Sequence, residues 1–167
     1  MRLFIASPAT IHDIDALRSD IAPTVRGRWT ASDSWHLTWY FIGESDDAQP
    51  YIRRLRGIPL RFDRPIPLDR LATFGKPPHI VYATAKAEVF QAQAEALAQA
   101  GLLADRFTPH VTLCRIKAIE DAQALQQALH RPRAAPLGYV LPQLVLYRSI
   151  LTPQGARYQA LFTHQAL

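Results

Sequence analysis

The sequence is poor in cysteine and has no long apolar run, and both absences limit what the protein can be. Cys114 is the only cysteine among 167 residues, so no disulfide can form within the chain and no thiol-rich metal site is possible. No segment approaches the roughly 20 apolar residues needed to span a bilayer. The apolar start meets Pro8 and a polar segment too soon for a secretory signal. We therefore expect a cytoplasmic protein that makes no membrane contact.

Lysine is also scarce, although the chain is basic. Nineteen Lys and Arg against 14 Asp and Glu give a formal charge of +5, and the only lysines are Lys76, Lys86 and Lys117. The positive charge is thus mainly arginine, whose planar guanidinium fits phosphate and stacks on bases. This balance favours a polyanionic ligand, although a general charge for solubility explains it equally well.

Apolar periodicity and turn residues predict strands that alternate with helices along the whole chain. The predicted strands are residues 2–6, 36–42, 80–85, 110–116, about 140–151 and 158–162. The predicted helices are residues 12–21, 50–60, 87–100 and 120–130, with Gly101 as a C-terminal cap. The proline-rich residues 59–79 should form strand edges and turns. No long polar linker is present, so residues 1–167 are expected to form one domain from a duplicated α+β unit.

Two short motifs carry the strongest functional signal. His36 and Thr38 alternate with apolar residues in the first, and His110 and Thr112 do so in the second. On a strand, residues two apart share a face, so each histidine lies beside its threonine. A single strand histidine is usually a half-buried structural residue. Two matched copies at corresponding places in the chain are improbable by chance.

The paired motifs suit attack on a phosphodiester. Such a reaction needs a base for the nucleophile, an acid for the leaving oxygen, and donors to the non-bridging oxygens. Two imidazoles with an unperturbed pKa of about 6.5 and two hydroxyls supply that set without a metal.

The sequence resembles the two-histidine (2H) phosphoesterases, and within them the RNA 2',3'-cyclic phosphodiesterases long called 2'-5' RNA ligases. The resemblance spans nearly the whole chain and includes residues 2–6, His36 to Glu44, Phe107 to Arg115, Leu146 to Gly155, and Tyr158. One segment, Ala72 to Pro78, departs from the family pattern of a glycine-rich approach to a Phe-Pro turn.

The resemblance implies a bilobal α+β fold with pseudo-two-fold symmetry, in which two antiparallel sheets flank a central cleft and the helices lie outside. It also implies metal-independent hydrolysis of RNA or nucleotide 2',3'-cyclic phosphate ends to 2'-phosphates. By this analogy His36 is the proton donor and His110 the proton acceptor, although these roles could be exchanged, while Thr38 and Thr112 bind the phosphate. We expect a monomer that needs no cofactor. Its expected partners are RNA with a 2',3'-cyclic phosphate end or cyclic nucleotides.

Phe41 and Arg115 each come five residues after their motif histidine and are candidates for binding the nucleobase. Strict alternation places both on the face opposite the histidines unless the strand bulges or twists there. The same alternation places Cys114 beside His110 and Thr112, which suggests a cysteine nucleophile, but a small buried side chain is far more common.

Three other functions compete with the phosphodiesterase interpretation. The first is an RNA-end-binding module without turnover, and the second is an enzyme for a small cyclic nucleotide or for 2'-5' linked oligonucleotides. The third is a metal-dependent hydrolase, for which only Asp33, Glu44 and Asp105 are carboxylates near the histidines in sequence.

Overall fold

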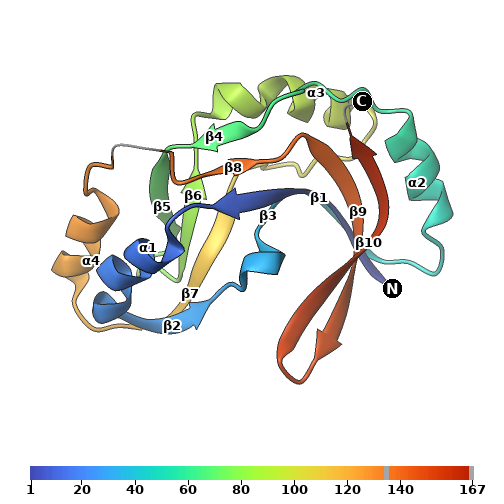
Figure 1. The fold of residues 1–167 in the computed structure, drawn as a ribbon. Coiled ribbons are helices and arrows are strands. Elements are labelled where there is room, and N and C mark those ends of the chain that lie inside the picture. The colour runs from blue at the N-terminus through green and yellow to red at the C-terminus, as the bar shows by residue number, and fades with distance from the viewer. Residues whose placement is uncertain (134–135, 166–167) are drawn as a thin grey trace.

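The computed structural model describes residues 1–133 and 136–165, and its main feature is a strongly curved antiparallel sheet (Figure 1). The sheet strands are β1 (Arg2–Ile11), β2 (Val25–Trp29), β3 (His36–Glu44), β4 (Ile66–Leu68), β5 (Arg70–Phe74), β6 (Ile80–Thr84), β7 (Val111–Ile119), β8 (Gly138–Val140), β9 (Gln143–Thr152) and β10 (Gly155–Gln165). The helices are α1 (Ile14–Ile21), α2 (Gln49–Arg56), α3 (Gln91–Gln99) and α4 (Ala122–Leu129), with 3₁₀ turns η1 (Ala22–Thr24), η2 (Ser32–Ser34) and η3 (Ala87–Phe90).

The strands run in the order β10-β9-β1-β3-β7-β6-β5, with β2 paired to β7 and β8 bridging β1 and β4. One lobe consists of β10, β9, β1 and β3, and the other of β2, β7, β6 and β5. The two lobes meet where β3 pairs with β7 through Leu37 and Val111. The expectation of two separate sheets is therefore corrected: the lobes are parts of one continuous sheet, because the strands that carry the two motifs pair with each other.

Side chains from both lobes share one core. Leu37 and Trp39 of β3, Leu113 of β7, and Phe90 and Leu97 beneath them all belong to the same buried cluster. Burial of such large apolar side chains is the main stabilising contribution to a fold of this kind. A second cluster joins α1 and α4 to the back of β7, and Figure 1 shows the helices on the outside of the sheet. Within the described residues, no helix has the length and apolar character needed to cross a membrane.

The sequence pattern predicted most elements but missed β2. That strand contains Gly27 and two arginines, Arg26 and Arg28, and its central residues are exposed, so it lacks the apolar alternation that marks a strand. It forms because one edge pairs with β7. Gly101 adopts φ +70° after α3, as predicted for a C-terminal cap.

Candidate active site

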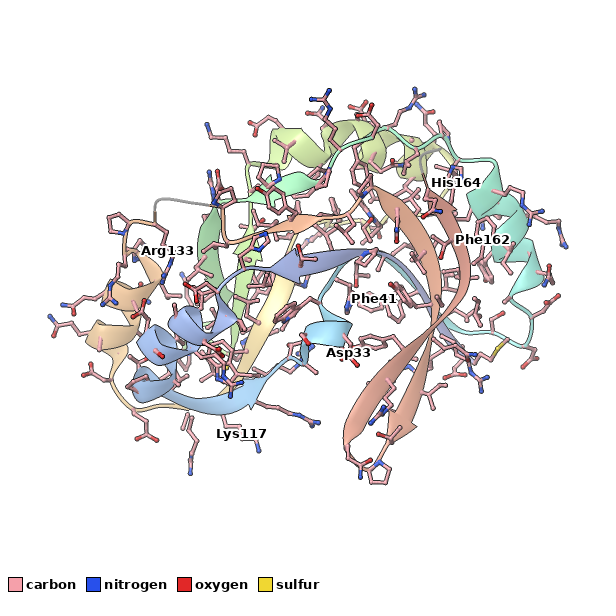
Figure 2. All side chains as sticks on the ribbon, in the orientation of Figure 1. Asp33, Phe41, Lys117, Arg133, Phe162 and His164 are labelled. Atoms are coloured by element: carbon pink, nitrogen blue, oxygen red, sulfur yellow. The ribbon has the colours of Figure 1, made fainter. Side chains whose placement is uncertain are left out.

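A cavity of about 350 Å³ lies between the two lobes and brings together every site residue predicted from the sequence. Those six are His36, Thr38 and Phe41 from β3, and His110, Thr112 and Arg115 from β7 or the residue before it. The rest of the lining consists of Arg2, Leu3, Phe4, Thr30, Ser34, Gly43, Ser149, Leu151, Ala156 and Tyr158. Figure 2 shows Phe41 and Asp33 on the side where the β9–β10 hairpin projects.

The two imidazole rings are held in the same way. Nδ1 of His36 lies 2.7 Å from the carbonyl oxygen of Ser34, and Nδ1 of His110 lies 2.8 Å from that of Thr108. A carbonyl only accepts hydrogen bonds, so each Nδ1 is protonated and donates. In the neutral form this leaves Nε2 without a proton, as a base requires. Both rings therefore present the same reactive atom.

Aromatic rings pack against each histidine. The ring of His36 lies 5.3 Å from that of Phe4 and 5.1 Å from that of Tyr158. The corresponding distances from His110 are 5.0 Å to Phe74 and 5.6 Å to Tyr82. Such packing restricts rotation of each imidazole ring. Phe74 comes from the segment that departs from the family pattern, so this segment builds the wall beside His110.

Burial and nearby positive charge both disfavour a proton on these imidazoles. Burial lowers the pKa of His36 below its usual 6.5, and positive charge on His110 and Arg115 lowers it further, while the hydrogen bond to Ser34 opposes the shift. Burial likewise lowers the pKa of His110, and Arg115 adds to the effect. The guanidinium of Arg115 is therefore close enough to act on both rings. A bound anion would reverse these shifts.

Matched β-bulges turn Phe41 and Arg115 toward the cavity. Along β3 the pairing with β1 skips Trp39, and along β7 the pairing with β6 skips Leu113; each skipped residue comes three positions after its histidine. An extra residue in one strand reverses the alternation beyond it. A second skipped residue in each strand, Ile42 in β3 and Lys117 in β7, restores the original alternation. The face assignment from strict alternation is thus wrong for residues 40–41 of β3 and 114–116 of β7.

The bulge in β7 also explains where Cys114 lies. Its side chain is fully buried in the cluster behind the sheet, and burial raises the pKa of its thiol. Alternation had placed it beside His110, but the structure turns it away from the cavity. The buried structural role is therefore the one that the structure favours.

The carboxylates required by a metal-dependent hydrolase lie elsewhere. Asp33, Glu44 and Asp105 are absent from the cavity lining, and Glu44 instead forms an ion pair with the N-terminal amine at 3.3 Å. Among residues 1–133 and 136–165, no three or more His, Cys, Asp or Glu side chains cluster as metal ligands would. Metal independence stays a prediction that a chelator experiment can decide.

Sequence reasoning missed the supporting residues. The aromatic rings on each histidine come from β1, β10, β5 and β6, and only the fold brings them together. The carbonyl partners, Ser34 and Thr108, each stand two residues before their histidine, and both precede the motif strand, so no strand pattern marked them.

Two copies of one family pattern cover nearly all of the chain. The model of the LigT-like phosphoesterases matches residues 5–82 and again residues 83–158. The chain therefore belongs to the LigT-like phosphoesterase family, which confirms the resemblance and the duplication. Because β9 comes from the second copy but pairs with β1 from the first, each lobe combines strands from both copies.

Similarities to individual proteins support this family assignment. The chain is 33% identical to an RNA 2',3'-cyclic phosphodiesterase of Aeropyrum pernix, over 90% of this chain and 93% of the relative. A protein of the same name from Thermotoga maritima is 25% identical, over 99% and 95% of the two chains. Among solved structures, TT0787 of Thermus thermophilus superposes with a TM-score of 0.68 at 26% identity, covering 99% of this chain and 97% of that one. LigT of E. coli shares the fold, with a TM-score of 0.66 at 24% identity over 98% and 96%.

Proposed function

We propose that this protein hydrolyses 2',3'-cyclic phosphate ends of RNA or nucleotides to 2'-phosphates, without a metal. The observation that carries the proposal is the convergence of His36 and His110, with Thr38 and Thr112, on one cavity between the lobes. The RNA 2',3'-cyclic phosphodiesterases related to the chain support the same substrate class.

In the proposed reaction, water attacks the phosphorus and the bond from phosphorus to O3' breaks. Nε2 of His110 takes a proton from the attacking water, while Nε2 of His36, which is protonated beforehand, gives its proton to O3'. The products are a 2'-phosphate and a free 3'-hydroxyl. Thr38 and Thr112 donate hydrogen bonds to the non-bridging oxygens, whose charge grows in the transition state.

The charge of the substrate completes this arrangement. In the free protein, burial and the charge of Arg115 lower the pKa of both histidines. A cyclic phosphate carries one negative charge, which favours an imidazolium beside it. Because a charge on His110 also lowers the pKa of His36, the pair accommodates one proton more readily than two. One histidine then serves as acid and the other as base.

Phe41 and Arg115 hold the nucleotide in this proposal. The side chain of Phe41 is 70% exposed although it lines the cavity, which is unusual for a large apolar residue and suits stacking on a base. Arg115 comes from the other lobe. The flat face of its guanidinium can stack on a base, and its N–H groups can donate hydrogen bonds. Since both motifs belong to one chain, we propose that a monomer is sufficient.

The test is to incubate the protein with EDTA and an oligonucleotide that ends in a 2',3'-cyclic phosphate. Chromatography against authentic 2'- and 3'-phosphate standards should show only the 2'-phosphate, and reaction in ¹⁸O-water should place one label on it. A 3'-phosphate product or strict dependence on added metal would contradict the mechanism. Stable binding without product would instead indicate the RNA-end-binding module.

The substrate class needs its own panel. Nucleoside 2',3'-cyclic phosphates, cyclic-ended RNA and 2'-5' linked oligonucleotides should be compared by kcat/KM. We expect cyclic phosphates to be cleaved and 2'-5' linkages to be cleaved far more slowly, because the strained ring needs less activation. A higher kcat/KM for the 2'-5' linkage would show instead that cleavage of 2'-5' linked oligonucleotides is the main reaction.

A further inference from the structure

A second arginine stands directly beside Arg115. In the antiparallel pairing of β2 with β7, Arg28 is the residue opposite Arg115, and both side chains are exposed. Residues directly opposite each other point to the same face of a sheet. Arg115 lines the cavity, so Arg28, on the same face of the sheet, lies on the cavity side, about 4.8 Å farther out by one strand spacing.

Nothing in the described part of the chain neutralises this pair. Like charges directly opposite on adjacent strands destabilise a sheet. No Asp or Glu lines the cavity, and neither Arg28 nor Arg115 takes part in an ion pair within residues 1–133 and 136–165. Two arginines at directly paired positions, with no carboxylate in the cavity lining, are suited to bind an anion.

Arg28, just outside the cavity lining, contacts the β9–β10 hairpin, whose residues Leu151 and Ala156 line the cavity. Its Nη2 donates a hydrogen bond to the carbonyl oxygen of Gln154 in the turn between β9 and β10. The next residue, Gly155, has φ +115°, and a side chain there would collide with the guanidinium. A guanidinium has five N–H donors, so this contact leaves others available. Thr30, two residues after Arg28 and just past the end of β2, lines the cavity.

We infer that Arg28, beside Arg115, forms a second phosphate subsite that takes the phosphate on the 5' side of the reacting nucleotide. The inference rests on the proposed function, because it takes the cyclic phosphate to lie between the two histidines. It identifies the preferred substrate as a nucleotide with two phosphates, either the end of an RNA chain or a 5'-phosphorylated cyclic nucleotide. A nucleoside 2',3'-cyclic phosphate without the 5' group would leave the subsite empty.

Three substrates test the subsite: adenosine 2',3'-cyclic phosphate, its 5'-phosphorylated form, and the dinucleotide ApA ending in a 2',3'-cyclic phosphate. We expect the two substrates with a second phosphate to have a kcat/KM about tenfold higher, the usual size of a charge-assisted contact at a partly exposed site. Arg28→Ala should abolish this advantage, and Arg28→Lys should keep part of it. With the dinucleotide, Arg28→Ala should also reduce the slope of log kcat/KM against log salt by about 0.7.

The matched control is Arg53→Ala, which removes the same charge from the exposed face of α2, outside the cavity lining. It should leave the ratio between substrates intact. If Arg28 only supported the hairpin, Arg28→Ala would lower all three rates in parallel and keep the ratio, which would overturn the inference. An advantage confined to the dinucleotide and retained in Arg28→Ala would also overturn it, because the added nucleoside would then be responsible.

Calorimetry separates this inference from the proposed function. Adenosine 2',5'-bisphosphate should bind about tenfold more tightly than adenosine 2'-phosphate, and Arg28→Ala should remove the difference. If no substrate is turned over, the proposed hydrolysis fails, yet the binding difference still decides whether the subsite exists. Equal affinities for the two ligands would show that it does not.

Discussion

The two motif strands, β3 and β7, hold their histidines alike but present different side chains farther along. Each imidazole donates from Nδ1 to the carbonyl two residues earlier, packs against two aromatic rings, and precedes a bulge by three residues. Beyond the bulge, β3 presents Phe41 and β7 presents Arg115. In the proposed reaction the duplicated part supplies the acid and the base. The unmatched part is proposed to supply the substrate contacts, because a nucleotide has no two-fold symmetry.

The largest loss of activity is expected when each histidine is removed in turn. If the two rings are equivalent partners in proton transfer, His36→Ala and His110→Ala should each lower kcat several hundred-fold or more. The exposed His12 gives the control His12→Ala, which should keep full activity. Steady-state rates on a cyclic-ended oligonucleotide provide the measurement. Full activity in either cavity variant would show that the two histidines are not equivalent partners in proton transfer.

Removing either threonine hydroxyl should lower kcat by a similar factor, but by less than the loss of a histidine. Thr38→Val and Thr112→Val keep the side-chain shape but remove a donor to the phosphate, so each should lower kcat about 100-fold. Thr10→Val, at an exposed position of β1, is the matched control. A large loss in one variant and none in the other would mean that only one hydroxyl contacts the phosphate.

The residues after the bulges should behave differently from each other. Phe41→Ala removes a stacking surface and should raise KM about tenfold with little change in the pH profile. Phe41→Trp, which keeps a stacking ring, should restore most of the affinity. If kcat instead falls while KM is unchanged, Phe41 supports the histidine ring rather than the base.

Arg115→Gln should change the pH profile of activity, whereas Phe41→Ala should not. The positive charge of Arg115 lowers the pKa of both His36 and His110, so its removal should raise both. Both limbs of the bell-shaped profile of kcat/KM should then move to higher pH. A profile with unmoved limbs would show that Arg115 acts on the substrate alone.

The smallest expected effect concerns stability. Both histidines have a lower pKa in the folded protein than the usual 6.5, so below that pH the unfolded chain binds protons that the folded protein does not. The free energy of unfolding should therefore fall as pH decreases through about 6.5 and down to the folded-state pKa values. Thermal unfolding followed by circular dichroism should show a weaker pH dependence in His36→Gln. An unchanged dependence would contradict the burial of this ring.

The sequence predicted which residues line the cavity better than it predicted how the strands present them. His36, Thr38, His110 and Thr112 could be found because period-two alternation and repetition are visible in one dimension. The positions of Phe41, Arg115 and Cys114 could not be assigned, because a bulge depends on the pairing of a strand with its neighbour and leaves no local pattern. The strand that carries Arg28 was missed for the same reason, since it forms only through its pairing with β7.

Leu37 and Val111, the residues through which the lobes pair, come directly after His36 and His110 in the chain. The contact that joins the lobes therefore also sets the spacing of the two imidazoles. In the proposed reaction, any motion that spread the lobes at this point would lengthen both proton-transfer paths together, and turnover should stop before the fold is lost. Loss of catalysis during gentle heating would then report separation of the lobes earlier than any spectroscopic signal of unfolding.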